Sequence, residues 1–512
     1  MKVDLLLYNG TVLTIDDNNT VVNWIAAKDG RIIDLGCGGG YNQYLKTTGE
    51  AVDLMGKTVL PGFYDSHVNL VQTGLNILSL NLSEIRCMDE LFSIIRHKAS
   101  QLPEGEMIRG IGFDELKLIE KKLPNRYELD RCAPNNPVWI SRVDYHTSIV
   151  NSLALHMLNL PFNLEGIVRD GRSLPNGQLT GRASALVRSH MLGRTSEAEI
   201  SKGVHKALNL AIENGITSVN AVEGGFTFHD KLAEFMLENK NSFPIDITLF
   251  YQTVNVERIL SKGLKRIGGT IFLDGSFGSR TAALAEPYSD DSSKSGTLYF
   301  SQEELNSFIL DAHRNDLQIA VHAIGSKAIE QALTAYEHAQ AIYPRKDPRH
   351  RIEHFEMPTD EHIQRAIALG LVASVQPTYE YLWGGAGKMY ETRLGEARRK
   401  RTNPFNKYIK AGLIVAGGSD SDLTPMNPLL GIYSAVNHPT DEYAISVEDA
   451  IKLFTINGAK AVFEEETKGS IVKGKLADMV ILDTNPLEIH PSKINEISVV
   501  ATIKEGNILF VR

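Results

Sequence analysis

The chain has 512 residues, of which 43% are apolar and 22% charged, a balance typical of soluble globular proteins and sufficient for one large barrel plus a satellite domain. Its formal net charge of −9 and the lack of a prominent basic run argue against a nucleic-acid partner. No apolar run approaches the roughly 18 residues that cross a membrane, and the N-terminal MKVDLLLYNG contains an acid, so neither a membrane anchor nor a signal peptide is expected.

Both ends of the chain alternate apolar and polar residues between Asn-Gly, Asp-Gly and Gly-rich turns. Residues 1–58 contain DLLLYNGTVLTI, WIAAKDGRIIDLG and EAVDLMGKTVL, and residues 466–512 contain GSIVKGKLADMVILD and VVATIKEGNILFVR. This alternation predicts β-strands. Because neither end is long enough to bury a core alone, we predict that the two pair into one small β-sandwich domain.

Residues 59–465 alternate apolar strands with amphipathic helical stretches such as EELNSFILDAHR and KAIEQALTAYEHAQ. Eight strands are predicted, at residues 59–67, 215–223, 245–253, 269–276, 317–325, 349–356, 371–379 and 413–420. Eight such units predict an α/β fold of the TIM (β/α)8 barrel type. The long gap after the first strand predicts a large insertion, at about 75–195, over the catalytic face of the barrel.

Residues able to bind a metal lie at the ends of four predicted strands: His67, His322, His354 and Asp420. Active sites of such barrels lie at the C-terminal ends of the strands. Three imidazoles and a carboxylate suit zinc or a similar ion with water in an open position, and Asp420 could also take the proton of that water. The alternative is that each His is a hydrogen-bonded core residue and that GGSD is a capped turn.

Seven motifs then follow in order: PGFYDSHVNL, GGTIFLDGSFGSRTAAL, VHAIGSKA, HRIEH, GGSDSDLTPMNPL, FTINGAKAVF and GSIVKGKLADMVILD. Together they resemble the amidohydrolase superfamily, and within it the family-3 branch that includes N-substituted formamide deformylases. The resemblance implies a metal-dependent barrel hydrolase that cleaves a non-peptide C–N bond of a small molecule. It also implies that His67, His322, His354 and Asp420 are metal ligands and that Asp420 is the proton acceptor.

Two positions depart from the family pattern. The first-strand motif of the family is H-x-H, whereas this chain has Asn69 as the second residue. The family's fourth strand carries a Lys that becomes carbamylated and bridges two metals, and the corresponding residue here is Thr270. Because Asp420 is then the only fixed anion, two divalent ions would leave buried charge uncompensated. We therefore predict one divalent ion, with zinc as the expected metal.

Substrate contacts are predicted at two further positions. His146 matches a family position that reaches the pocket from the insertion, although it could instead support the loop. Arg280 could bind an anionic group through its guanidinium, although it could equally form a structural ion pair. Tyr379 and Trp383 are candidates for lining an apolar pocket, or for the core.

The remaining expectations concern the setting of the protein and the alternatives to hydrolysis. Three cysteines without C-x-x-C spacing favour a reducing cytoplasm, and a homodimer is compatible with a fold of this size. The departures at Asn69 and Thr270 also leave open a metal-depleted, non-catalytic paralogue that binds a small molecule. A mononuclear deaminase on the same scaffold is the third alternative.

Overall fold

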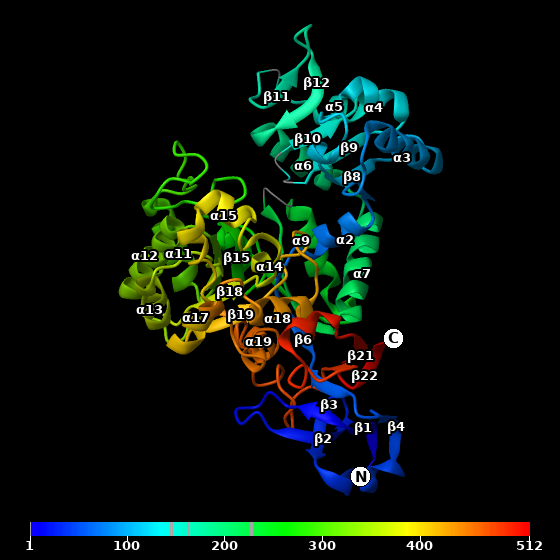
Figure 1. Cartoon of the computed structure of the whole chain (residues 1–512), viewed down its shortest axis with the longest axis vertical. Helices are drawn as coiled ribbons and strands as arrows, with labels where there is room; N and C mark the ends of the chain where they lie inside the picture. The colour runs from blue at the N-terminus through cyan, green and yellow to red at the C-terminus, as the bar shows by residue number, and fades with distance from the viewer. Residues whose placement is uncertain (1, 144, 146, 162, 226–228) are drawn as a thin grey trace. The chain divides into compact units, whose positions relative to one another are not determined.

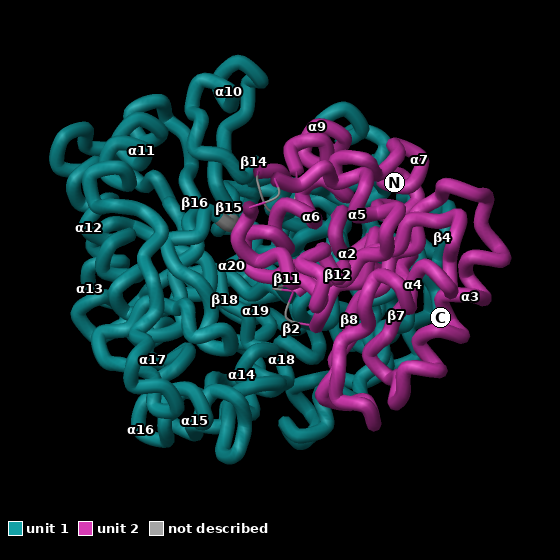
Figure 2. Tube along the Cα trace, turned by 90° about the horizontal axis from the view of Figure 1, so that it is seen from above, with its two compact units in different colours: residues 1–70, 208–223, 237–512 teal, residues 71–207, 224–236 magenta. Residues whose placement is uncertain are grey.

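The computed structural model describes residues 2–143, 145, 147–161, 163–225 and 229–512, except for the side chain of Thr270 (Figure 1). The chain divides into two compact units (Figure 2). Unit 1 comprises residues 1–70, 208–223 and 237–512, and unit 2 comprises residues 71–207 and 224–236. The first stretch of unit 2 includes residues 75–195, the range of the predicted insertion, and its short second stretch follows the second barrel strand.

Unit 1 contains a parallel barrel whose described residues form an eight-stranded sheet in chain order. The strands are β6 (Phe63–Val68), β13 (Ile216–Glu223), β14 (Asp246–Tyr251), β15 (Arg266–Phe272), β16 (Gln318–Ala323), β17 (Arg351–His354), β18 (Val372–Val375) and β19 (Ile414–Gly417). Beyond β19 the chain returns to β6, where Val68 forms a parallel bridge with Ser421 and the Asp420 N–H donates to the His67 carbonyl at 2.8 Å. The predicted (β/α)8 barrel is confirmed.

The first predicted strand, residues 59–67, is two strands in two different sheets. Thr58–Pro61 (β5) belongs to the terminal sheet, and Phe63–Val68 (β6) belongs to the barrel. Gly62 lies between them, and a Cβ at Gly62 would lie 2.3 Å from the Thr217 hydroxyl oxygen. The chain therefore passes from one sheet to the other where no side chain fits.

Helices separate the barrel strands, as the amphipathic stretches predict. Ser301 and Glu304 form a reciprocal capping box that starts α11, which satisfies two backbone donors at the helix end. The helices of unit 1 are α1 (Asn42–Leu45), α10 (Val256–Ser261), α11 (Gln302–Arg314), α12 (Ser326–Ile342), α13 (Asp360–Ala368), α14 (Thr378–Trp383), α15 (Met389–Leu394), α16 (Glu396–Arg399), α17 (Phe405–Ala411), α18 (Pro428–Val436), α19 (Val447–Leu453) and α20 (Ile456–Lys460). Among the helices that the structure describes, none combines the length and apolar character needed to cross a bilayer.

The two ends of the chain form one mixed sheet beside the barrel, as the sequence predicts. Its order is β22-β21-β20-β5-β1-β2-β3, with β4 paired to β1. The strands are β1 (Val3–Leu13), β2 (Val21–Lys28), β3 (Arg31–Gly36), β4 (Thr48–Asp53), β5, β20 (Met479–Leu482), β21 (Val499–Lys504) and β22 (Asn507–Val511). The antiparallel pairing of β5 with β20 joins the ends, and Leu5, Leu7, Ile25, Met479 and Ile481 share one buried cluster.

Unit 2 has its own sheet, in the order β11-β12-β10-β9-β8-β7 among its described residues. The strands are β7 (Leu80–Asn81), β8 (Ile108–Phe113), β9 (Val138–Arg142), β10 (Thr147–Val150), β11 (Ile167–Arg169) and β12 (Pro175–Thr180), and the helices are α3 (Met88–Gln101), α4 (Arg126–Cys132), α5 (Ser152–Leu158) and α6 (Gly181–Arg194). Helices α2 (Leu70–Ile77), α7 (Glu197–Glu213) and α9 (Asp230–Asn239) include residues of both units. Leu91, Ile95, Phe113 and Ile140 form part of a separate core.

Candidate metal centre

Three of the four predicted metal ligands meet at the C-terminal end of the barrel strands. Ligand atoms of His67, His354 and Asp420 all lie within 4.8 Å of one another, and the three side chains are buried. His67 lies near the end of β6, His354 ends β17, and Asp420 follows β19. Strands far apart in the sequence thus bring two imidazoles and one carboxylate to a single point.

His67 is oriented by the buried carboxylate of Glu353 on β17, a strand that is not paired with β6 among the described residues. Its Nδ1 lies 2.6 Å from Glu353 Oε2, which leaves Nε2 facing Asp420 Oδ1 at 3.5 Å. That Nε2 is buried and has no hydrogen-bond partner among the described residues. Burial alone would lower the pKa of His67, but the carboxylates of Asp420 and Glu353 raise it to about 9. Positive charge at Nε2 is therefore stabilised.

Glu353 is held in turn by a buried arginine. Arg351 Nε lies 2.7 Å from Glu353 Oε1 and Arg351 Nη2 lies 2.9 Å from Oε2, in a two-pronged ion pair with no solvent exposure on either side chain. The same Nη2 donates to the Ser66 carbonyl at 2.6 Å. Residues two apart on a strand share a face, so Arg351 and Glu353 point together toward β6.

His354 presents a neutral imidazole to the same point. Its Nδ1 lies 2.7 Å from Gln376 Oε1, so Nδ1 carries the proton and Nε2 carries the lone pair. Burial lowers the pKa of His354 to about 4. The backbone of His354 is left-handed, with φ of 73°. Such a conformation is uncommon outside glycine and occurs often at functional sites.

Asp420 is ionised and accepts two side-chain hydrogen bonds. Burial opposes its charge, but His67 holds the pKa of Asp420 below its ordinary value. Asn69 Nδ2 donates to Oδ1 at 3.0 Å, and the Tyr379 hydroxyl donates to Oδ2. The Tyr379 ring stacks on His354 with an interplanar angle of 11°. Tyr379 therefore contacts both a candidate metal-ligand imidazole and the candidate proton acceptor.

The two departures from the family pattern have different outcomes in the structure. Asn69 lies beside Asp420, and its Oδ1 is buried without a hydrogen-bond partner among the described residues. Its amide nitrogen, a donor, points to the carboxylate of Asp420. Asn69 therefore forms a hydrogen bond with Asp420 and does not take the place of a second imidazole ligand. The backbone of Thr270 lies in β15, and its side chain is outside the described residues.

His322, the fourth predicted ligand, is not part of the group of three. Its Nε2 lies 3.1 Å from the Gly275 carbonyl, so this nitrogen must carry the proton. The lone pair is then on Nδ1, which is buried and lacks a partner among the described residues. Its ring centroid is 4.4 Å from that of His354. Burial and the neighbouring His354 lower the pKa of His322 well below its usual value, so His322 is neutral.

Arg280, one of the two predicted substrate residues, has no described contact with the group of three. Arg280 Nε and Nη2 lie 3.0 Å and 2.8 Å from the two oxygens of Asp290, which is the geometry of its ion-pair alternative. Its backbone is also left-handed, with φ of 57°. A role for Arg280 in substrate binding stays a prediction. His146 lies outside the described residues.

Sequence reasoning missed Glu353 and Gln376, and pointed to Tyr379 only as a lining aromatic. A signal for Glu353 was present, because it directly precedes a candidate ligand in HRIEH and shares strand parity with Arg351. Gln376 and Tyr379 lie in QPTY just beyond β18, at the level where ligands end the other strands. Polar residues at the ends of ligand-free strands are the general signal for such partners.

The donor set fits one divalent ion. The Nε2 atoms of His67 and His354 and an oxygen of Asp420 give two nitrogens and one oxygen, the combination found in catalytic zinc sites with an open position. Both imidazoles have their second nitrogen bonded to a side-chain oxygen, which fixes ring orientation and makes Nε2 more basic. The unpartnered, buried Nε2 of His67 is explained by such an ion.

Comparisons with known proteins agree with this geometry. The sequence model of the amidohydrolase family matches residues 50–510. The protein LONG AFTER FAR-RED 3 of Arabidopsis thaliana is 31% identical over 99% of this chain and 91% of its own length. N-substituted formamide deformylase of Arthrobacter pascens is 26% identical over 99% of this chain and 98% of its own length.

A solved structure shares the fold across nearly the whole chain. It is an uncharacterized metal-dependent hydrolase from Pyrococcus furiosus, with a TM-score of 0.81 and 26% identity over 94% of this chain and 100% of that chain. The resemblance drawn from the seven sequence motifs is confirmed. Since the family model spans most of the sequence and a relative above 30% identity is matched almost throughout, the chain belongs to the amidohydrolase family.

Proposed function

We propose that this chain hydrolyses a non-peptide C–N bond of a small molecule, in an amide, N-formyl or cyclic amide group, with one divalent ion, zinc being the expected metal. The observation that carries the proposal is the convergence of His67, His354 and Asp420 within 4.8 Å at the mouth of the barrel. Similarity to an N-substituted formamide deformylase supports the bond type. Residues from three strands would not meet in this way merely to fill a core.

Different side chains of the site would have different roles in such a reaction. An ion bound here would polarise the substrate carbonyl and acidify water. The Nε2 atoms of His67 and His354 would hold the ion, and Glu353 and Gln376 keep the two rings oriented. Asp420 is ionised and lies beside these ligands, so it can accept a proton from water and return it to the leaving nitrogen.

One ion suits the charge of the site better than two. Asp420 is the only carboxylate in the described group of three, and Asn69 directs a donor, not a lone pair, toward it. A threonine at position 270 cannot carry the carbamate that would bridge a pair. Two ions would therefore bring four positive charges against one fixed negative charge, which is costly in a buried cavity.

The test combines metal content with turnover. We expect about one zinc per chain by elemental analysis after purification from zinc-supplemented medium, and hydrolysis of at least one compound from a panel of N-formyl, N-acyl and cyclic amides. Asp420→Asn is expected to abolish turnover. Two tightly bound equivalents per chain would refute the single-ion site, and full activity in Asp420→Asn would reject the role of this carboxylate.

A non-catalytic binding protein is the second candidate, and the replacements at Asn69 and Thr270 favour it. Both remove ligands that the family uses. If the site is a lapsed metal pair, the double substitution Asn69→His and Thr270→Lys should raise the metal content. Stoichiometric metal and turnover in the native chain would exclude this candidate. A mononuclear deaminase, the third possibility, is distinguished by release of ammonia from an amino-substituted ring.

A further inference from the structure

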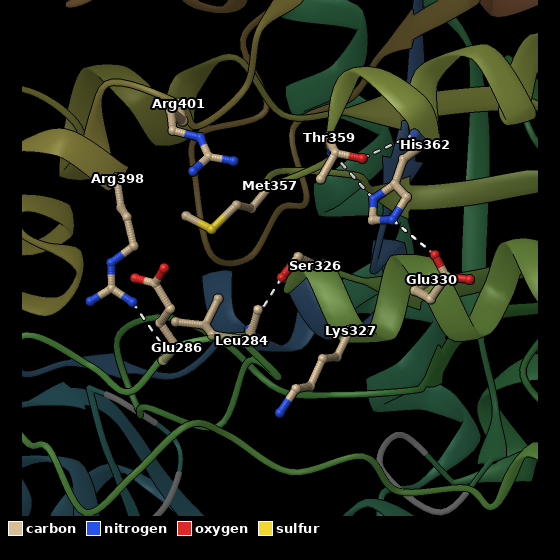
Figure 3. Close-up of a pocket in the computed structure, with 11 residues that line it drawn as sticks. Leu284, Glu286, Ser326, Lys327, Glu330, Met357, Thr359, His362, Arg398 and Arg401 are labelled. Atoms are coloured by element: carbon tan, nitrogen blue, oxygen red, sulfur yellow. Dashed lines mark hydrogen bonds and ion pairs between the residues drawn. The ribbon is translucent and has the colours of Figure 1, made fainter.

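A second cavity in unit 1 is lined by residues that take no part in the metal centre. Its volume is about 400 Å³, which lies in the range of small-molecule pockets. Figure 3 shows its lining, from the chain after β15, the start of α12, the chain after β17, and α16 with the residues that follow it. The lining residues are Leu284, Ala285, Glu286, Ser326, Lys327, Glu330, Met357, Thr359, His362, Arg398 and Arg401.

Three cationic side chains line this cavity, and none of them is paired with a carboxylate among the described residues. Among the residues that the structure describes, Arg398 donates only to neutral oxygens: the carbonyls of Leu394 at 2.7 Å and Glu286 at 3.2 Å, and the Ser289 hydroxyl at 2.9 Å. Within the described part of the chain, the Lys327 ammonium and the Arg401 guanidinium have no hydrogen bond or ion pair. Figure 3 shows the three around the apolar side chains of Leu284 and Met357.

The acidic residues of the lining do not balance these charges. Glu330 lies 2.7 Å from Arg365 and 3.1 Å from His362, so its charge is already compensated. Glu286 is the remaining carboxylate of the lining. Three cations therefore face one available anion. Like charges gathered around a cavity repel one another, and an anion bound between them would relieve this repulsion.

The helix that borders the cavity adds to the positive potential. Lys327 is the second residue of α12, which is 17 residues long and has no acidic residue in its first turn. The N-terminus of a helix carries partial positive charge, so a lysine there is unfavourable unless an anion lies nearby. The helix end thus adds to the positive potential that the three unpaired cations create around the cavity.

We propose that this cavity binds a small organic anion. Its phosphate or carboxylate group would contact Lys327, Arg398 and Arg401, and its apolar part would pack on Leu284 and Met357. These two apolar residues belong to a buried cluster that also contains Tyr379, and Trp383 packs against that cluster.

The experiment is a calorimetric titration of the full chain, at constant ionic strength, with inorganic phosphate, phenyl phosphate and phenylacetate. Saturable binding of at least one probe is expected, and the tighter of the two phenyl compounds identifies the anionic group. Lys327→Gln and Arg401→Gln should each weaken binding by about tenfold, the usual effect of losing one charge-assisted hydrogen bond. Both residues are exposed, so both variants are expected to fold.

Two controls distinguish probe binding in this cavity from general effects of surface charge and from binding at the metal centre. Lys410→Gln removes a lysine that is also exposed but lies outside the lining, and it should leave binding unchanged. Asp420→Asn should also leave it unchanged, whatever happens to turnover. The proposal is overturned if no probe binds saturably, if the Lys327 and Arg401 variants bind as the native chain does, or if Asp420→Asn abolishes binding.

Discussion

Glu353→Gln tests whether the buried Arg351–Glu353–His67 chain supports the metal centre. The substitution keeps the shape of the side chain and removes a carboxylate that lies 2.7 Å and 2.9 Å from two nitrogens of Arg351 and 2.6 Å from His67 Nδ1. Neither Arg351 nor Glu353 is exposed to solvent. Breaking a buried pair leaves an uncompensated charge and costs about 3–5 kcal/mol of unfolding free energy.

The same change should weaken metal binding. Loss of a carboxylate partner of a metal-binding histidine typically reduces metal affinity by about 10- to 100-fold. The assays are urea unfolding of the metal-free chain and a competitive zinc titration of the folded chain. Arg351→Met removes the charge that Glu353→Gln leaves unpaired. The double variant should therefore lose less unfolding free energy than the sum of the losses in the two single variants.

Glu337→Gln provides a matched control on the surface. Glu337 is also bound by two nitrogens of an arginine, Arg365, at 2.7 Å and 2.9 Å, but 42% of its side chain is exposed. Its loss should cost less than about 1 kcal/mol and leave zinc affinity unchanged. If Glu353→Gln were no more destabilising than Glu337→Gln, or if it left zinc affinity intact, the assigned role of Glu353 would be wrong.

Three further predictions concern the same region. Tyr379→Phe removes the hydroxyl that donates to Asp420, so kcat/KM in the hydrolysis assay should fall by about 10- to 100-fold while zinc content is retained. Gly418→Ala places a Cβ 2.5 Å from the His67 backbone nitrogen, so thermal unfolding should show a loss of about 1–3 kcal/mol, with weaker zinc binding; native stability would contradict this. Burial raises the pKa of Glu380 from 4.5 to about 7, so the folded state keeps a proton that the unfolded state loses. Stability should then fall as pH rises from 4.5 to 7, and Glu380→Gln should flatten this slope in urea titrations at pH 5 and 7.

Local sequence patterns were sufficient to predict the architecture of the fold. Eight apolar stretches separated by amphipathic ones predicted the barrel, because period-two and 3.6-residue patterns report which face of an element is buried. These patterns did not determine where the first strand begins and ends. Residues 59–67 formed one continuous apolar run, and only the close approach of Gly62 to Thr217 shows where the chain leaves one sheet for another.

The residue types of the site followed from sequence, whereas their partners did not. The motifs and strand ends pointed to His67, His322, His354 and Asp420, and the structure brings ligand atoms of His67, His354 and Asp420 within 4.8 Å of one another. Sequence could not say that His322 directs Nε2 to the Gly275 carbonyl, since that depends on where the loop after β15 lies. Nor could it show that Glu353 is shared between His67 and a buried arginine, because these bonds cross between strands distant in the chain.

The amino-acid sequence by itself determined the barrel, the joining of the two termini in one sheet, and the chemical identity of the candidate ligands, because these depend on hydrophobic periodicity and on residue type. Only the tertiary structure decided which three ligands converge, which imidazole nitrogen is available, and where unpaired cations gather around a second cavity. These features depend on distances between side chains far apart in the chain, and such distances are set when the whole chain packs.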